Sequence, residues 1–137
     1  MEDRYLFKAK RVDNGEWVIG NLVFSVYTRN DVCVGQYGND IGMHIVDPST
    51  ICQCTGLKDK NGNLIWENDI VGYWDTYSTD NGTAEADCIG KVVWDNETIS
   101  FEVTERLSAE SYEVLDECSV ISNIFDNPEL LKRGIYE

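Results

Sequence analysis

The sequence predicts a mainly β protein, and two observations carry that prediction. Segments such as "RYLFKAKR" (4–11) and "ISFEVT" (99–104) alternate between two kinds of side chain with the period of a β-strand. Tight-turn dipeptides, Asn14-Gly15 and Asn61-Gly62, stand between such segments; they tolerate positive φ and join antiparallel strands. At 137 residues the chain fits one domain, or one domain with a small subdomain.

The predicted elements follow one another along the chain with short turns between them. Strands are expected at 4–11, 16–27, 31–37, 42–47, 50–57, from 69 to 74, over 88–104 as a hairpin turning at Asp95-Asn96, and at 118–125. Residues 75–87 contain no large aliphatic side chain and are predicted to form a long exposed loop. The pattern of 105–117 leaves irregular packing and a short helix both open. A short C-terminal helix is expected after Asn127, with Pro128 in its first position and Lys132 in its last turn.

The charge of the chain is acidic and unevenly placed. Acidic residues outnumber basic ones 25 to 11, and residues 75–117 hold twelve acids against Lys91 and Arg106. Such a field repels nucleic-acid phosphates and anionic lipid, so we expect neither nucleic-acid nor membrane binding. The plainest interpretation is a solvated acidic face, and the functional one is contact with a basic protein partner. The candidate partner-binding residues are Asp87, Asp95, Glu97, Glu102, Glu105 and Trp74.

Five cysteines, an odd number, and a start without an apolar run predict reduced thiols and a cytoplasmic location. Cys52 and Cys54 would lie on one face of a strand, but a zinc site needs four ligands and the second close pair is missing. The remaining cysteines and the single histidine, His44, are scattered. We therefore predict no metal and no cofactor, with the cysteines acting as small apolar side chains.

The stretch "CTGLKDKNGNLIWENDIV" (54–71) is the densest in turn residues. An EF-hand frame with its glycine at Gly62 would put Leu57 in the first ligand position, and leucine cannot ligate calcium. Paired acid–base work by Glu67 and Asp69 is conceivable, but a carboxylate accepting backbone N–H groups accounts for the same spacing. The predicted role is structural, with no catalytic residues. The turn residues are Asn61, Gly62, Glu67, Asn68 and Asp69.

This stretch, together with "GKVVW" (90–94) and "SNIFDNPELL" (122–131), resembles the YopX family of phage and prophage proteins. The matching positions are Thr55 to Gly62, Ile65 to Glu67, Asp69 to Val71, Gly90, Val92, Trp94, Asn123 to Phe125 and Asn127 to Leu131. The family's tyrosine before Thr-Gly is Cys54 here, and its glycine in Glu-Gly-Asp is Asn68. The resemblance implies an N-terminal β subdomain (1–53) and an SH3-like small barrel with a C-terminal helix (54–137). It implies no activity.

The function expected from these observations is a non-enzymatic protein-binding module, an accessory protein of phage or prophage type. Three alternatives stay open. The acidic segment could mimic nucleic acid and block a host DNA-binding enzyme. The chain could be an oligomeric scaffold that assembles through exposed β edges. A hydrolase could use Glu67, Asp69 or a bound cation.

Overall fold

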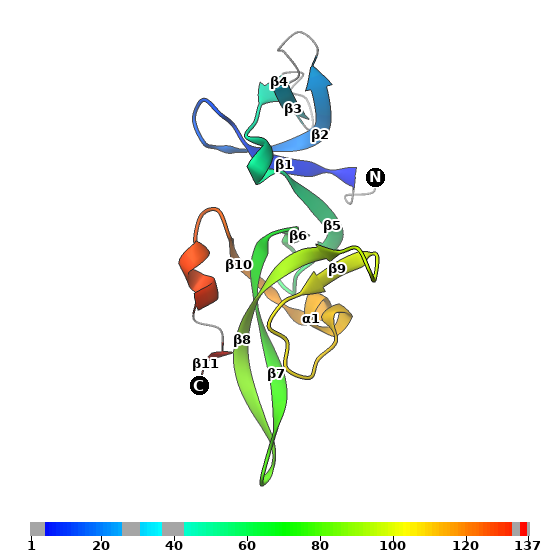
Figure 1. Ribbon diagram of the computed structural model, residues 1–137, viewed down its shortest axis with the longest axis vertical. Coiled ribbons are helices and arrows are strands. Elements are labelled where there is room, and N and C mark those ends of the chain that lie inside the picture. The colour runs from blue at the N-terminus through cyan, green and yellow to red at the C-terminus, as the bar shows by residue number, and fades with distance from the viewer. Residues whose placement is uncertain (1–4, 26–30, 37–42, 133–134, 137) are drawn as a thin grey trace. The chain divides into compact units, whose positions relative to one another are not determined.

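The computed structural model describes residues 5–25, 31–36, 43–132 and 135–136 (Figure 1). Its contacts divide the chain into two units, Met1–Gly56 and Leu57–Glu137. Both are built mainly from antiparallel strands, which confirms the predicted fold class. No helix in the described ranges has the length and apolar character needed to cross a bilayer.

The first unit is an antiparallel sheet with the strand order β4-β3-β2-β1-β5. β1 and β2 are joined through Asn14-Gly15, where Gly15 has a φ of +72°, as the turn dipeptide predicts. The predicted turn at residues 38–40 lies outside the described residues. The elements are β1 (Phe7–Lys10), β2 (Trp17–Ser25), β3 (Asp31–Gln36), β4 (Met43–Ile45), the 3₁₀ turn η3 (Pro48–Thr50) and β5 (Cys52–Lys58).

Ala9, Val18 and Val46 form the buried core of this unit, with Leu22 and Ile51 packed against it. Lys10 and Thr50 are also linked, because the hydroxyl of Thr50 accepts a hydrogen bond of 2.8 Å from the Lys10 N–H. The same hydroxyl donates to the carbonyl of Asp47 at 2.7 Å. A neutral side chain therefore fastens the turn of η3 to β1.

The second unit is a sheet with the order β10-β7-β8-β11, and β9 pairs separately with β8. β5 runs past Gly56 into this unit, where its end leads through the Asn61-Gly62 turn into β6. The sheet is open among the described residues, so the SH3-like barrel implied by the resemblance is not confirmed. The elements are β6 (Leu64–Trp66), β7 (Asp69–Thr79), β8 (Gly82–Asp95), β9 (Ser100–Val103), α1 (Ser111–Glu117), β10 (Ser119–Asn123), η4 (Pro128–Lys132) and β11 (Ile135–Tyr136).

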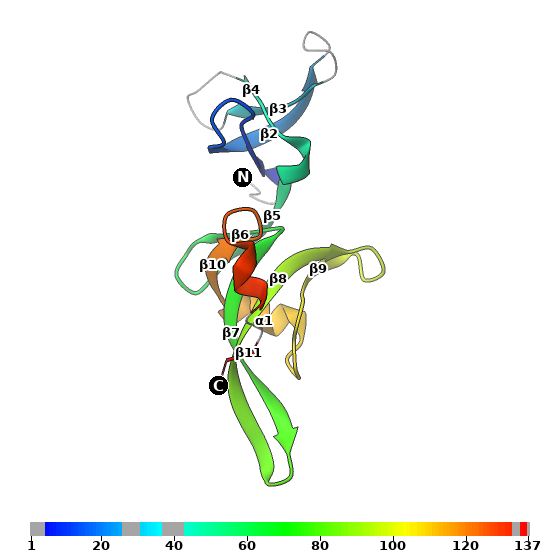
Figure 2. The same ribbon diagram turned by 60° about the vertical axis from the view of Figure 1, so that its left-hand side comes forward.

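The long loop predicted at 75–87 is wrong. β7 and β8 pair continuously from Ile70↔Lys91 to Thr79↔Gly82, and only Asp80 and Asn81 lie between them. Large aliphatic side chains are lacking because residues 76–85 are almost wholly exposed and need no apolar face. We call residues 76–85 the arm; both views show this hairpin running out beyond the rest of its unit (Figures 1 and 2).

The core of the second unit lies between one face of the β7–β8 sheet and the elements α1, β6 and β9. Gly90 allows the close approach of β8 to the segment after β9, because a Cβ there would collide with the carbonyl oxygen of Thr104. The predicted C-terminal helix is present as the 3₁₀ helix η4. The buried residues are Ile65, Val71, Tyr73, Ala86, Cys88, Val92, Val103, Val114, Leu115 and Cys118.

Candidate functional site

Helix α1 positions most of the acidic side chains of the candidate site. Val114 and Leu115 are buried in the core, so Glu113, Asp116 and Glu117, on the other side of the helix, face solvent. The Glu113 carboxylate accepts a hydrogen bond of 3.2 Å from the Glu110 N–H, which satisfies one of the free donors at the start of the helix. The helix ends at Cys118, whose N–H donates to the Val114 carbonyl at 2.9 Å. This placement leaves four carboxylates along the exposed side of one short helix.

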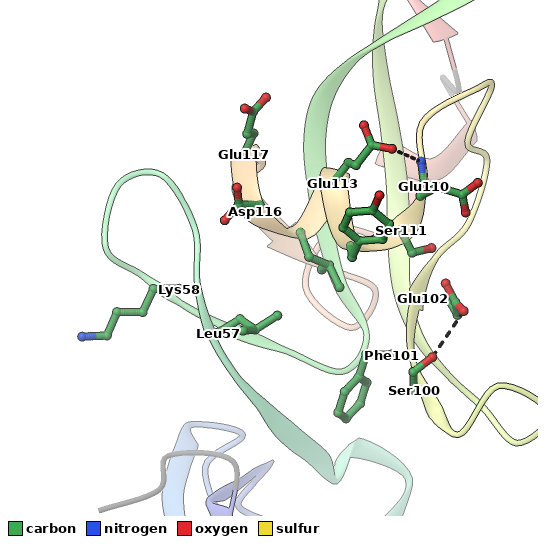
Figure 3. A pocket seen from close by; sticks show the side chains of 12 residues that line it. Leu57, Lys58, Ser100, Phe101, Glu102, Glu110, Ser111, Glu113, Asp116 and Glu117 are labelled. Atoms are coloured by element: carbon green, nitrogen blue, oxygen red, sulfur yellow. Dashed lines mark hydrogen bonds between the residues drawn. The ribbon is translucent and has the colours of Figure 1, made fainter.

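These carboxylates line a groove of about 690 Å³, which we call the acidic groove (Figure 3). Its apolar lining comes from three elements: Leu57 at the end of β5, Phe101 in β9 and Leu115 in α1. Lys58 extends away from the carboxylates (Figure 3). The groove is lined by Leu57, Lys58, Ser100, Phe101, Glu102, Glu110, Ser111, Tyr112, Glu113, Leu115, Asp116 and Glu117.

Hydrogen bonds hold the Glu102 carboxylate of the groove in its charged form. Interaction with the Ser111 hydroxyl lowers its pKa, partial burial opposes this, and the hydroxyls of Thr98 and Ser100 lower it further. The latter two lie 3.0 and 3.3 Å from Oε1. Hydroxyl donors stabilise the ionised carboxylate, so Glu102 contributes a fixed negative charge to the groove.

A second hollow, of about 440 Å³, lies beside the base of the arm and is lined by Trp74, Asp75, Thr76, Glu85, Ser108, Ala109 and Glu113. Asp75 is buried there and fastens the segment 107–109 to β7. Its carboxylate accepts the N–H groups of Leu107 at 2.7 Å and Ala109 at 2.9 Å, and the hydroxyl of Ser108 at 3.0 Å. Burial alone would raise the pKa of Asp75, but these donors lower it below the usual value.

A third hollow, of about 270 Å³, lies on the face of the β10-β7-β8 sheet that points away from the core; we call it the Trp74 hollow. Trp74 is 65% exposed and Ile121 is 48% exposed. Asp87 is the cross-strand partner of Trp74. The lining residues are Lys60, Gly72, Tyr73, Trp74, Asp87, Cys88, Ile89, Glu117, Ser119 and Ile121.

The three hollows adjoin one another through shared lining residues, and we call them together the acidic surface. Glu113 lines the acidic groove and the second hollow, Trp74 lines the second and third, and Glu117 lines the acidic groove and the Trp74 hollow. Eight of the twelve acids of residues 75–117 belong to this surface: Asp75, Glu85, Asp87, Glu102, Glu110, Glu113, Asp116 and Glu117. Lys58 and Lys60 are the cationic residues that line it.

The structure brings together three of the six predicted partner-binding residues. Trp74, Asp87 and Glu102 line the acidic surface. Asp95 instead caps the β8–β9 turn, where its Oδ1 accepts the Glu97 N–H at 2.8 Å. Glu97 and Glu105 are exposed and line none of the three hollows.

The predicted turn residues Asn61 and Gly62 lie in a reversal organised by Asp59. The Asp59 Oδ1 accepts the N–H groups of Asn61 at 2.9 Å and Asn63 at 2.8 Å, and Oδ2 accepts the Val120 N–H at 2.8 Å. Burial opposes ionisation, yet these backbone donors lower the pKa of Asp59. Asp59 thus ties the turn to β10.

The second reversal carries Glu67, Asn68 and Asp69 between β6 and β7. Asn68 has a φ of +71°, a left-handed conformation that asparagine tolerates. Asp69 is 2% exposed, and its Oδ2 accepts the Trp66 N–H at 2.8 Å. Glu67 is half-buried, and neither it nor Asp69 lines any of the three hollows. The Asp69 carboxylate therefore serves the main chain.

Cys52 and Cys54 are both buried, and both are free thiols. The Cys52 thiol donates to the Thr50 carbonyl at 3.3 Å, and the Cys54 sulfur accepts the Gly56 N–H at 3.4 Å. Within the described ranges, no three side chains of histidine, cysteine, aspartate or glutamate come together as a metal site would require. The side chain of Cys33 lies outside the described part of the chain.

Two parts of the site were missed by the prediction from sequence. The acids Glu110, Glu113, Asp116 and Glu117 were counted in the charge of 75–117 but not named as partner-binding residues. Their spacing of three and four residues on either side of Val114 and Leu115 would have placed them on one helix face. The sequence places Asp75 in a loop, and no local signal marks its donors in residues 107–109, which lie 32 to 34 residues away.

The fold and the hollows define a two-unit, mainly β protein with an acidic concave surface on its second unit. The chain belongs to the YopX family, described as YopX protein, whose model matches residues 7–132. A solved structure, protein EF1440 from Enterococcus faecalis, is 27% identical over 91% of this chain and 96% of that one, with a TM-score of 0.54. No curated protein matches the chain.

Proposed function

We propose that this protein is a non-enzymatic accessory protein of phage or prophage type that binds a basic segment of another protein on its acidic surface. The observation that carries the proposal is the continuity of that surface, where eight acids and two lysines line three joined hollows. A cytoplasmic location is part of the proposal. It is supported by the four described cysteines, which are all free thiols.

The apolar lining of the acidic groove favours a protein partner over mimicry of nucleic acid. A mimic of a phosphate backbone needs only ordered negative charge, whereas Leu57, Phe101 and the 73% exposed Tyr112 offer apolar contact area. Buried aromatic and aliphatic contacts inside a polar rim are typical of protein interfaces. A basic amphipathic segment could place its positive charges beside the carboxylates of the groove and its apolar side chains on the apolar lining.

Charge disfavours the scaffold, and the burial of Asp69 disfavours the hydrolase. The second unit contains eighteen acidic and six basic residues, so two copies brought together at this surface would repel one another. A hydrolase built on Glu67 and Asp69 would need both at an open cleft, but Asp69 is buried against the Trp66 amide. Neither alternative gives the three hollows a role.

The proposal is tested by titrating the full-length protein with octa-lysine in a calorimeter at low and at moderate salt. We expect binding that weakens as salt increases, because the contacts are between exposed charges. The triple variant Glu113→Gln/Asp116→Asn/Glu117→Gln should weaken binding about tenfold, since exposed charge pairs each contribute roughly 0.2–1 kcal/mol. Glutamine at 113 keeps an oxygen that can accept the Glu110 N–H.

A matched control removes the same number of charges away from the hollows. Asp80, Glu97 and Glu105 are exposed and line none of them, so Asp80→Asn/Glu97→Gln/Glu105→Gln should change octa-lysine binding much less. Equal weakening by the two triple variants would show that net charge alone attracts the peptide. That result, or no binding at low salt, would contradict the proposed surface.

A further inference from the structure

The Trp74 hollow combines an exposed indole, an apolar floor and carboxylates in a space the size of one side chain. Because Val71 and Tyr73 point into the core, their strand neighbours Gly72 and Trp74 lie on the opposite face. Gly72 contributes no side chain, and the tip of Ile121 lies 3.0 Å from where its Cβ would stand. The tip of Ile121 therefore lies over Gly72, where it forms part of the apolar floor of the hollow.

Two exposed apolar side chains and two carboxylates surround this space. Trp74 is 65% exposed and Ile121 is 48% exposed, so both offer apolar area to a bound side chain. Asp87 lies directly across from Trp74, on the same face of the sheet, and Glu117 lines the other side. Within the described part of the chain, Asp87 and Glu117 have no ion-pair partner.

We propose that the Trp74 hollow receives an arginine side chain of the basic partner, with the guanidinium stacked on Trp74 and paired with Asp87. This inference rests on the proposed function. A guanidinium is planar, stacks on indole and forms two parallel hydrogen bonds with a carboxylate, whereas an ammonium offers only a point charge. The hollow's volume of about 270 Å³ suits one long side chain and is too small for a helix.

Other occupants fit this chemistry less well. A neutral apolar side chain would cover Trp74 and Ile121, but it would remove water from Asp87 and Glu117 without a compensating charge. An anion would be repelled by both carboxylates, although Lys60 also lines the hollow. A second copy of this chain would bring further acidic residues to an acidic face. An arginine side chain can stack on the Trp74 ring and balance the charge of the carboxylates at the same time.

The test compares octa-arginine with octa-lysine, two peptides of equal length and charge, in calorimetric titrations of the full-length protein. We expect octa-arginine to bind about fivefold more tightly, because a guanidinium stacks flat on the ring and forms two parallel hydrogen bonds with a carboxylate, which an ammonium cannot do. Trp74→Leu should abolish this preference, because leucine retains apolar area but has no π face. Asp87→Asn should reduce the preference, because it removes the carboxylate that would accept two hydrogen bonds from the guanidinium.

The controls separate this inference from the proposed function. Trp94→Leu replaces another exposed tryptophan, one that packs edge-on against Phe101, and it should leave the preference unchanged. Glu113→Gln/Asp116→Asn should weaken both peptides alike. Equal binding of the two peptides to the unmodified protein, or a preference that survives Trp74→Leu, would overturn the arginine site while leaving the proposed function intact. Failure of both peptides to bind would overturn both.

Discussion

The two units differ in the buried side chains that fasten their turns. In the first, a neutral hydroxyl, that of Thr50, accepts the N–H of Lys10. In the second, buried carboxylates of Asp59 and Asp75 accept several backbone N–H groups each. The first unit has seven acids and five bases, and the second has eighteen acids and six bases. The comparison shows that negative charge in the second unit has two separate uses, one internal and one on its surface.

The largest difference in stability loss between the two units is expected when the Asp75 charge is removed. In the unmodified protein the N–H groups of Leu107 and Ala109 donate to the carboxylate oxygens of Asp75. In Asp75→Asn an NH₂ group would replace one of these oxygens and face a donor. The second unit should therefore lose about 3 kcal/mol of unfolding free energy. The matched change in the first unit, Thr50→Val, removes two neutral hydrogen bonds and should cost less, about 1.5 kcal/mol. Urea titrations followed by NMR, which resolves residues of each unit, measure both. Equal losses would contradict the difference.

Gly90 tests the packing of the second unit without changing any charge. In Gly90→Ala the new methyl group would collide with the Thr104 carbonyl, so we expect a loss of about 2 kcal/mol. Gly72→Ala in the neighbouring strand is the control, because its methyl would meet only the movable end of Ile121. The same urea titrations give both values. A neutral Gly90→Ala would mean that β8 and the segment after β9 can move apart freely.

A smaller, graded effect is expected from acid. Folding lowers the pKa of Asp59 and Asp75, so their contribution to stability is present above the unfolded-state pKa of about 3.9 and is lost as the pH falls below it. The urea midpoint of the second unit should therefore begin to fall near about pH 5 and fall most steeply below about pH 4. Asp75→Asn should flatten this dependence. If the urea midpoint of Asp75→Asn changed with pH as steeply as that of the unmodified protein, Asp75 would be excluded as the source of the pH dependence.

Local chemistry explains why most of the fold could be predicted. Turn dipeptides such as Asn14-Gly15 and Asn61-Gly62 specify a reversal from two residues, and the strands beside them alternate visibly. The arm was missed because its strands are polar on both faces, so its pairing depends on the opposite strand. Asp80-Asn81-Gly82 at its tip is a turn signal, and Gly82 has a φ of +119°. That signal could have identified the hairpin.

The candidate site was predicted less completely than the fold. The charge pattern identifies the acidic segment. Of the residues predicted there, Trp74, Asp87 and Glu102 line the acidic surface. The charge pattern could not show that Asp95 would be taken up by its own turn, nor that Asp75 would be buried. The burial of Asp75 depends on tertiary contacts with residues 107–109. The role of Asp95 depends on a local bond at the turn predicted at Asp95-Asn96, so its position there could have identified it as a capping residue.

The scarcity of cations that shapes the second unit also determines how a protease would meet it. Between Lys60 and Lys91 the chain contains neither lysine nor arginine, so trypsin has no cleavage position in β6, in β7 or along the arm. The tip of the hairpin is nevertheless open to enzymes that cut after acidic residues, beginning with Asp80. Digestion with the two kinds of protease would therefore leave this hairpin whole in one case and nicked in the other.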